Sequence, residues 1–320
     1  MKSAPPDDSF SQYPPQSKTQ MSILTSTDLK GSLELLSRGK VRDLYAIPNS
    51  DSLLFVATDR ISAYDVNMKN GIQDKGRLLT GLSEFWFDLL KDVCPNHLLS
   101  TEIPEAAAEF KDQLVGRSMV VKKHKIFAVE AIVRGYITGS AWSEYQKKGT
   151  VHGIKVAEGL QESEKFPEPL FTPSTKAEAG EKVNSDENIH PDEVAAIVGG
   201  QHYADRIKEL AIELYTKAAQ HAEKKGIIIA DTKFEFGLNE KGEVVLVDEV
   251  LTPDSSRFWL QSTYKVGGGQ DSYDKQFLRN WLTETGVKGV EGIEMPAEIV
   301  QKTRAKYIEA YEMLTGKQWQ

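Results

Sequence analysis

The sequence predicts two lobes that combine β-sheets with helices and share a cleft. A length of 320 residues with 40% hydrophobic content is enough for one large core or for two such lobes. Short apolar runs separated by turn-rich segments dominate residues 33–125, which indicates a sheet-rich first lobe. A long amphipathic helix and a strand pair follow residue 200, which indicates a mixed second lobe.

Charge and residue usage exclude several classes of protein. The net charge of -8 and pI near 5.4 argue against a nucleic-acid partner, because such proteins normally present a basic face. The single cysteine, Cys94, excludes an intrachain disulfide and fits a reducing compartment. The sequence has no apolar stretch near the roughly 18 residues that a membrane span needs. We therefore expect a cytoplasmic protein with no membrane partner.

The first part of the chain divides into an extension and a lobe. Residues 1–20 are rich in Pro, Ser, Asp and Gln, and they have too few aliphatic side chains to offset the entropy of ordering. They are predicted to form a flexible N-terminal extension. In residues 21–130 the apolar runs Leu53–Ala57 and Met119–Val121 predict strands, and the spacing around Leu82–Leu90 predicts a helix.

A boundary between the lobes is expected near residue 130, so residues 131–320 form the second lobe. The run Ala128–Val133 predicts a strand, and the glycines that follow it lead into a short predicted helix, Ala141–Lys148. The polar, proline-bearing residues 157–190 predict a long surface loop, and loops of that length are often functional.

Two helices and a hairpin are predicted in the rest of the second lobe. Residues Ala204–Lys225 have apolar side chains at helical spacing and Gly226 as a stop signal. The runs Ile227–Phe236 and Glu243–Asp248 predict the two strands of a hairpin. An amphipathic helix over about Pro296–Thr315 ends the chain.

The strand pattern around residue 233 is the most informative feature of the sequence. Because side chains alternate along a strand, Asp231, Lys233 and Glu235 share one face. The facing strand ends at Asp248 and Glu249, so the hairpin brings carboxylates and an ammonium group together, as a Mg-nucleotide site requires. The alternative is a solvated strand face with cross-strand ion pairs.

Two further segments carry cations in patterns that suit phosphate. Gly39 permits close approach of the backbone, and Lys40 and Arg42 alternate after it along a predicted strand. The alternative is an exposed basic turn, since the segment matches no established phosphate-loop pattern. Lys275 and Arg279 lie four residues apart on one predicted helical face, which is either solvated or directed at a ribose phosphate.

Charged residues also lie at both ends of the apolar run near the predicted boundary between the lobes. Burying Glu130 or Arg134 without a partner would be costly, so each is expected to serve a ligand or to pair with the other. Arg134 suits a carboxylate or phosphate, and Ser140 lies in a turn flanked by glycine. After the predicted hairpin, Asp248 and Glu249 are followed in quick succession by Asp254 and Arg257, which is more charge than an ordinary hairpin exit carries.

Together these segments resemble the SAICAR synthetase family, the phosphoribosylaminoimidazole-succinocarboxamide synthases, and in particular its single-function fungal form. The resemblance runs from about Leu36 to Trp281, and several ordered motifs are more specific than any one of them. The motifs are GKVRDLY (39–45), TDRISAYDV (58–66), KGRLLT (75–80), VEAIVRGYITGSAW (129–142), ADTKFEFG (230–237) and VDEVLTPDSSRFW (247–259).

The resemblance implies an α+β fold of two lobes with antiparallel sheets, related to the ATP-grasp and protein-kinase nucleotide sites. It implies that ATP contacts Gly39, Lys40, Arg42, Lys122, His124, Lys176 and Lys233. Glu235 and Asp248 are the implied Mg2+ ligands, and the implied catalytic group is Lys233, Glu130 and Asp231. The implied ribonucleotide contacts are Arg134, Ser140, Asp254, Arg257, Lys275 and Arg279, and Arg60, Ser62 and Asp65 are expected to face substrate without an assigned role.

The implied reaction is ATP-dependent amide formation between L-aspartate and the carboxylate of 5-amino-1-(5-phospho-D-ribosyl)imidazole-4-carboxylate (CAIR), through an acyl phosphate. A monomer that binds only small molecules is expected. Two alternatives remain at this point. The first is a small-molecule kinase, because a D-x-K strand followed by glycine also occurs in inositol phosphate kinases. The second is a non-catalytic nucleotide-binding module, which would be expected to lack metal carboxylates, whereas Glu235 and Asp248 are both present.

Overall fold

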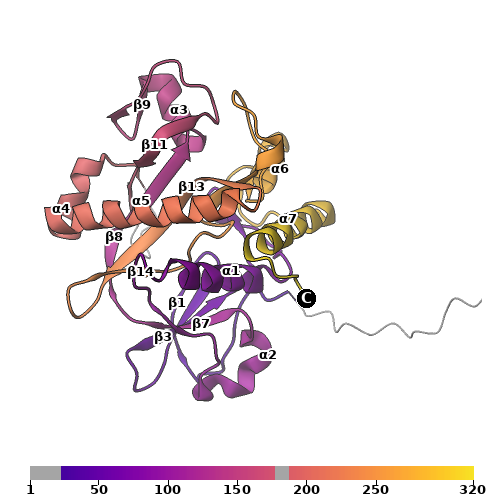
Figure 1. The fold of residues 1–320 in the computed structure, drawn as a ribbon. Helices are drawn as coiled ribbons and strands as arrows, with labels where there is room; N and C mark the ends of the chain where they lie inside the picture. The colour runs from indigo at the N-terminus through magenta and orange to yellow at the C-terminus, as the bar shows by residue number, and fades with distance from the viewer. Residues whose placement is uncertain (1–22, 177–186) are drawn as a thin grey trace, which may run out of the picture.

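The fold was analysed in a computed structural model that describes residues 23–176 and 187–320. Figure 1 shows two layers of strands with long helices between and beside them. The predicted extension at residues 1–20 lies outside the described residues.

The first sheet contains five antiparallel strands in the order β1-β2-β3-β7-β6. It confirms the predicted strands around residues 53–57 and 119–121. Its strands are β1 (Glu34–Arg38), β2 (Arg42–Ala46), β3 (Ser52–Ala57), β6 (Leu98–Ser100) and β7 (Ser118–Lys122), and the small pair β4 (Ser62–Ala63) and β5 (Val66–Asn67) lies outside it.

The second sheet has six strands and is centred on two long ones. The path runs β11-β8-β13-β14, with β12 also on β8 and β15 also on β13. The predicted hairpin is confirmed as β13 and β14. The strands are β8 (Lys125–Tyr136), β11 (Lys165–Phe171), β12 (Ser174–Thr175), β13 (Ile227–Leu238), β14 (Val244–Val247) and β15 (Ser256–Leu260), and β9 (Thr150–Val151) pairs separately with β10 (Ile154–Lys155).

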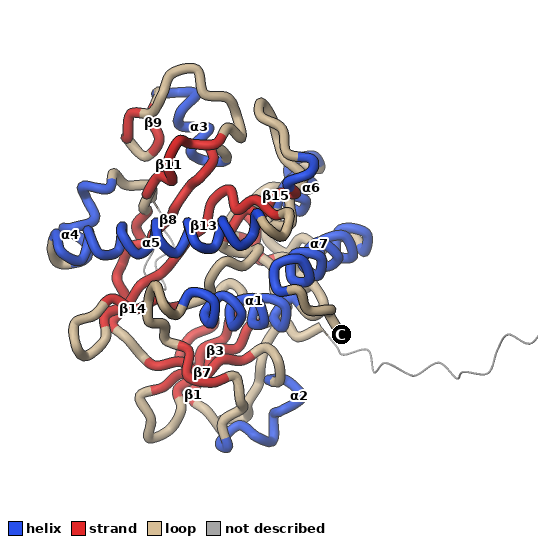
Figure 2. Tube along the Cα trace, viewed as in Figure 1, coloured by secondary structure: helices blue, strands red, loops and turns tan. Residues whose placement is uncertain are grey.

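Helices lie against both sheets (Figure 2). Helix α1 packs on β3 and β7 and also touches α5 and α7, whereas α5 runs across β8 and β13. No helix in the described part of the chain is long and apolar enough to cross a membrane. The helices are α1 (Lys75–Leu90), α2 (Lys111–Leu114), α3 (Gly139–Lys148), α4 (Val194–Val198), α5 (Gln201–Glu223), α6 (Gln276–Glu284) and α7 (Ala297–Thr315), with short 3₁₀ turns at 105–110, 191–193 and 261–263.

One large apolar core joins the two sheets. It includes Trp86 of α1, Val121 of β7, Val129 of β8, Leu214 of α5 and Leu246 of β14, all almost fully buried. The chain passes from the first sheet to the second at residues 123–124, and β8 then continues without a break through residue 130. Cys94 is a buried member of this core, as expected of a small apolar side chain.

The prediction of a loop throughout residues 157–190 was wrong in part. Within it, β11 and β12 pair antiparallel with β8. Pro167 and Pro169 lie where the register of β11 is irregular, and β11 is an edge strand, which is where a sheet tolerates residues that lack an N–H donor. Residues 177–186 of the predicted loop are outside the described part.

Gly135 is required by the packing of α5 on β8. A Cβ atom at this position would lie 2.0 Å from the hydroxyl of Tyr215, and that hydroxyl donates a 2.6 Å hydrogen bond to the carbonyl of Ile229. Tyr215 is buried, so it has little room to move. The close contact therefore fixes how near the helix lies to the sheet.

Gly135→Ala should lower the free energy of unfolding by about 2–3 kcal/mol, because the added methyl group overpacks the contact. Tyr215→Phe removes the clashing oxygen, so the double variant should lose less stability than the sum of the single variants, with a coupling of about 1 kcal/mol. Urea unfolding measures the free energy of unfolding of the two single variants and of the double variant. Gly269→Ala is the control, since a Cβ atom added there would meet no other atom within 4 Å. Strict additivity would contradict the proposed clash.

Candidate functional site

The charged row on β13, consisting of Asp231, Lys233 and Glu235, lies at the centre of the candidate site. The Lys233 Nζ donates to Glu130 Oε1 at 2.6 Å and to Glu235 Oε1 at 3.0 Å. Glu130 and Glu235 face each other across β8 and β13, so the ammonium group lies between two carboxylates. Lys176 also pairs with Glu235, and Ser174 donates to Glu130.

Arg42 and Asp248 join this row from two distant parts of the chain. The Arg42 guanidinium lies 2.6 Å from Asp248 Oδ2 and 3.5 Å from Glu249 Oε2. Asp248 immediately follows β14 and has φ of 64°, a left-handed conformation that is uncommon outside glycine. Strain of this kind often occurs at functional positions, where the surrounding structure maintains it.

The electrostatic environment favours the charged forms of Lys233 and Asp248. Burial would lower the pKa of Lys233, but the neighbouring Glu235 and Glu130 carboxylates raise it above its ordinary value. Burial would likewise raise the pKa of Asp248, yet Arg42 and Lys233 lower it. The Lys233 ammonium group and the Asp248 carboxylate are therefore both favoured in their charged forms at neutral pH.

The carboxylates of Glu235 and Asp248 fit the chemistry of Mg2+. They are hard oxygen donors, and Mg2+ is usually held by one or two carboxylates together with substrate phosphates. The described residues contain no group of three or more His, Cys, Asp or Glu side chains arranged to hold a metal ion alone. Two carboxylates beside Lys176, Lys233 and Arg42 therefore suit a metal that arrives with a polyphosphate.

The other predicted nucleotide contacts border this cluster or the junction between the sheets. Gly39 lies in the turn between β1 and β2, where its N–H donates to the carbonyl of Arg42 at 2.8 Å. Lys40 forms an exposed 2.6 Å ion pair with Asp65, which has φ of 63°. Lys122 ends β7, where it pairs with Glu240 at 3.2 Å, and His124 lies in the connection to β8.

A second cluster is built around Asp231. Its Oδ2 accepts hydrogen bonds from Arg134 at 3.0 Å and from Arg257 at 2.5 Å, and a further nitrogen of Arg134 lies 3.2 Å from the Ser140 hydroxyl. Burial lowers the pKa of Arg134, whereas Asp231 raises the pKa of Arg257. The suggested pairing of Glu130 with Arg134 is not formed, because each has a partner on β13 instead.

A third cluster surrounds Asp254 and includes residues to which the sequence analysis assigned no role. The fully buried Lys75 lies 2.7 Å from Asp254, Lys275 lies 3.5 Å from it, and the hydroxyl of Tyr307 donates to it at 2.8 Å. Lys75 belongs to the KGRLLT motif, but no charge pattern in the sequence around it indicates that its partner is the distant Asp254. Tyr307 comes from α7, outside every motif.

The three remaining predicted residues differ in how far their side chains are already engaged. Arg279, on α6, forms no hydrogen bond or ion pair through its guanidinium within the described ranges, so it is available to an anion. Ser62 is buried in β4. Arg60 was expected to face substrate, but its guanidinium is occupied by protein acceptors, chiefly backbone carbonyls.

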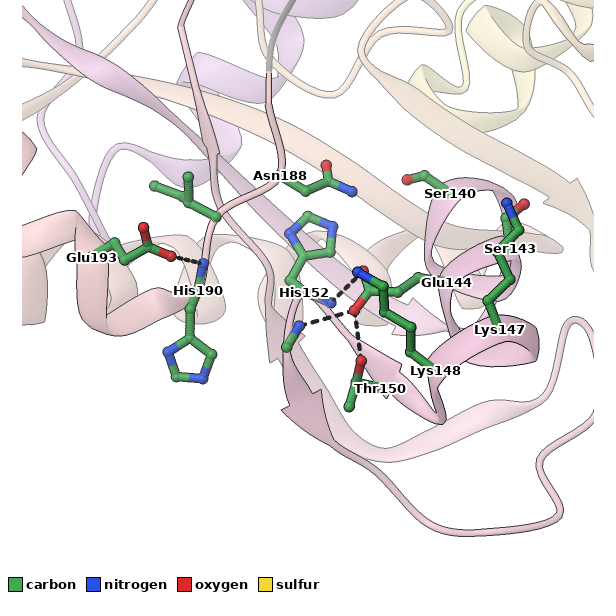
Figure 3. Close-up of a pocket in the computed structure, with 12 residues that line it drawn as sticks. Ser140, Ser143, Glu144, Lys147, Lys148, Thr150, His152, Asn188, His190 and Glu193 are labelled. Carbon is green, nitrogen blue, oxygen red and sulfur yellow. Dashed lines mark hydrogen bonds between the residues drawn. The ribbon is translucent and has the colours of Figure 1, made fainter.

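A hollow of about 680 Å³ opens beside the second cluster (Figure 3). Ser140 lies at its edge, and Lys147, His152 and Asn188 line it. Glu144 shapes the wall, because its carboxylate accepts the backbone N–H groups of His152 and Gly153 and the hydroxyl of Thr150. His152 is buried with φ of 50° and lies 3.0 Å from the Pro173 carbonyl through Nδ1.

Comparison with known proteins decides the family. The SAICAR synthetase family model matches residues 35–296, which is most of the chain. The chain belongs to the SAICAR synthetase family. It is therefore an ATP-dependent carbon–nitrogen ligase of purine biosynthesis, as the motifs predicted, and the kinase alternative is not favoured.

Similar relatives are found among yeasts. Phosphoribosylaminoimidazole-succinocarboxamide synthase of Cyberlindnera jadinii is 59% identical over 304 residues, which cover 93% of this chain and 99% of the relative. The Saccharomyces cerevisiae enzyme is 58% identical over 307 residues, with 92% and 99% covered. A solved structure described as SAICAR synthase from Saccharomyces cerevisiae complexed with SAICAR has a TM-score of 0.83 at 56% identity, covering 92% of this chain and 99% of that one. The mixed α+β fold with antiparallel sheets is thereby confirmed.

His152 should make the fold less stable in mild acid. Burial lowers its pKa from 6.5 to about 4, so between these values the unfolded chain binds a proton that the folded chain does not. The free energy of unfolding should therefore fall as the pH decreases from 6.5 to 4, by up to about 1.4 kcal/mol per pH unit from this residue.

The variant His152→Asn tests this expectation, because asparagine accepts the left-handed backbone but does not titrate in this range. Urea unfolding at several pH values should give a slope shallower by about one proton than in the wild type. His202→Asn, at an exposed position, controls for the substitution itself. Equal slopes in His152→Asn and wild type would contradict the assignment.

Proposed function

We propose that this ligase joins L-aspartate to the imidazole carboxylate of CAIR, using ATP and Mg2+, and releases ADP and phosphate. The observation that carries the proposal is the position of the Lys233 ammonium group between Glu130 and Glu235, with Arg42 and Asp248 alongside. With Mg2+ on the carboxylates, the two cations suit the charge of a nucleoside triphosphate. The name of the relatives, phosphoribosylaminoimidazole-succinocarboxamide synthase, supports the proposed product.

The first step converts the poorly reactive carboxylate into an acyl phosphate, which has a better leaving group. An oxygen of the CAIR carboxylate attacks the terminal phosphorus of ATP, the bond to the bridging oxygen breaks, and ADP leaves with that electron pair. Lys233 and Lys176 neutralise the charge that spreads over the transferred phosphoryl group. Glu130 holds Lys233 in place through its 2.6 Å hydrogen bond, so it acts on the reaction by positioning the ammonium group.

The second and third clusters hold the ribonucleotide in this proposal. Arg134, Arg257 and Ser140 offer donors to an anionic group, and Asp231 keeps the two guanidinium groups in a fixed relation. Lys275 and Arg279 add positive charge near the start of α6. Because Arg134 and Arg257 contact Asp231 of the β13 row, a bound ribonucleotide would extend its carboxylate toward Lys233.

In the second step, the amine of L-aspartate attacks the acyl phosphate carbon. The carbon–oxygen bond to phosphate breaks, phosphate leaves with the electron pair, and the nitrogen loses a proton to give the amide. In both steps the protein mainly aligns the reactants and neutralises charge, and these two effects account for most of the catalysis expected of the phosphoryl transfer in the first step.

Glu235 and Asp248 would hold Mg2+ together with phosphate oxygens of ATP. When bound, the metal supplies charge neutralisation on the phosphates and fixes their orientation. We further propose that the protein acts in the cytoplasm as a monomer, the location being supported by its single, buried cysteine.

Lys233→Ala should reduce ADP release at least about 100-fold in the presence of Mg-ATP, CAIR and L-aspartate, because the transferred phosphoryl group loses its principal cation. Coupled measurement of ADP with and without L-aspartate provides the assay. Lys265→Ala removes an exposed lysine and should retain wild-type turnover. ADP release that does not require L-aspartate would contradict the ligase assignment and favour a kinase.

Glu235→Gln should raise the Mg2+ concentration needed for half-maximal activity by about tenfold or more, since an amide is a weaker ligand than a carboxylate. A Mg2+ titration at fixed ATP concentration measures the change. Glu298→Gln, which alters an exposed ion pair on α7, should leave the titration unchanged. If both variants behave alike, Glu235 does not hold the metal.

A further inference from the structure

Arg60 binds the protein backbone around the phosphate loop, defined here as residues 39–41. Its Nε donates to the carbonyl of Lys40 at 3.1 Å, and NH2 lies 2.9 Å from the carbonyl of Gly39 and 3.1 Å from that of Arg42. The fourth carbonyl, that of Thr25, accepts from NH1 at 2.7 Å. One guanidinium therefore holds both ends of the turn between β1 and β2.

A buried carboxylate fixes Arg60 in turn. Asp43 Oδ1 lies 2.8 Å from Arg60 NH2, and Asp43 is fully buried. Its other oxygen accepts hydrogen bonds from the backbone N–H and the hydroxyl of Thr27, at 3.0 and 2.6 Å. The side chain of Arg60 is only 11% exposed, and its three guanidinium nitrogens all donate to protein acceptors, so it leaves little free surface for a substrate.

The planarity of the peptide unit determines where the N–H groups of Lys40 and Val41 point. In a planar trans peptide the carbonyl and the next N–H point in opposite directions. The carbonyls of Gly39 and Lys40 point to Arg60, so the N–H groups of Lys40 and Val41 point away from it. Neither N–H donates a hydrogen bond to any acceptor within residues 23–176 or 187–320.

We propose that Arg60 is a positioning residue for nucleotide binding, which holds the phosphate loop so that the Lys40 and Val41 amides face the phosphates of ATP. Adjacent backbone amides in a turn form a concave site for anions. The loop also leads directly into Arg42, which contacts Asp248 in the charged cluster. The inference rests on the proposed function for the identity of the nucleotide.

Arg60→Lys and Arg60→Gln test the proposal in the full-length enzyme. Neither replacement can bond all four carbonyls in the fixed fork that arginine provides. The KM for ATP should rise about tenfold or more, with kcat changed less than about threefold, because the loss is equivalent to one or two hydrogen bonds to the phosphates. The KM values for CAIR and L-aspartate should change less than about twofold on the same reasoning.

Arg304→Lys is the matched control. Arg304 also bonds a backbone carbonyl, that of Gln73, and an aspartate, Asp74, but it lies on α7 away from the loop. It should lower thermal stability without changing the KM for ATP. If the Arg60 variants only lower stability and leave the KM for ATP unchanged, the proposal is overturned. An effect confined to the KM for CAIR or L-aspartate would also overturn it, in favour of a direct substrate contact.

Calorimetric titration with ADP separates this inference from the assigned reaction and also serves for variants with little activity. ADP affinity of folded Arg60→Lys, checked by circular dichroism, should fall about tenfold in parallel with the KM for ATP. A wild-type protein that binds ADP but shows no aspartate-dependent turnover would contradict the proposed function alone. Unchanged ADP affinity in folded Arg60→Lys would contradict the role of Arg60, whatever the turnover.

Discussion

The arrangement of the site depends on one ammonium group, that of Lys233, placed between two carboxylates. Glu130 and Glu235 lie directly opposite each other on β8 and β13, a pairing that would repel without a cation. Lys233 bonds both, so it supports the register of the two longest strands of the second sheet. A slip by one residue would turn the whole β13 row toward the other face. The same contact therefore serves the fold and the candidate chemistry.

Those parts of the fold and of the candidate site that depend on local sequence patterns could be predicted. Alternation along a strand predicted that Asp231, Lys233 and Glu235 share a face, and a resemblance over several motifs predicted the family. The roles of Lys75 and Arg60 could not be predicted, because they depend on partners distant in sequence or on backbone carbonyls. The strand β11 was missed since its prolines are typical of loops and only its position at a sheet edge accommodates them.

The three clusters are assembled from contacts that are distant along the chain. Arg42 meets Asp248, Lys75 meets Asp254, and Tyr307 reaches Asp254 from the last helix. These contacts bring β2, α1 and α7 to the residues that follow β14. The site is therefore complete only when both sheets, α1 and α7 are in place, so loss of the tertiary structure at any one of these elements removes part of the charge arrangement.

The two prolines of β11 have a consequence for the behaviour of the protein at high concentration. An edge strand normally presents free N–H and carbonyl groups to which a strand of another molecule can add. Pro167 and Pro169 lack the N–H, and the irregular register of β11 bends the edge further from an ideal template. This side of the second sheet is thereby protected against intermolecular strand addition, so the molecule resists aggregation there without any charged side chain being required.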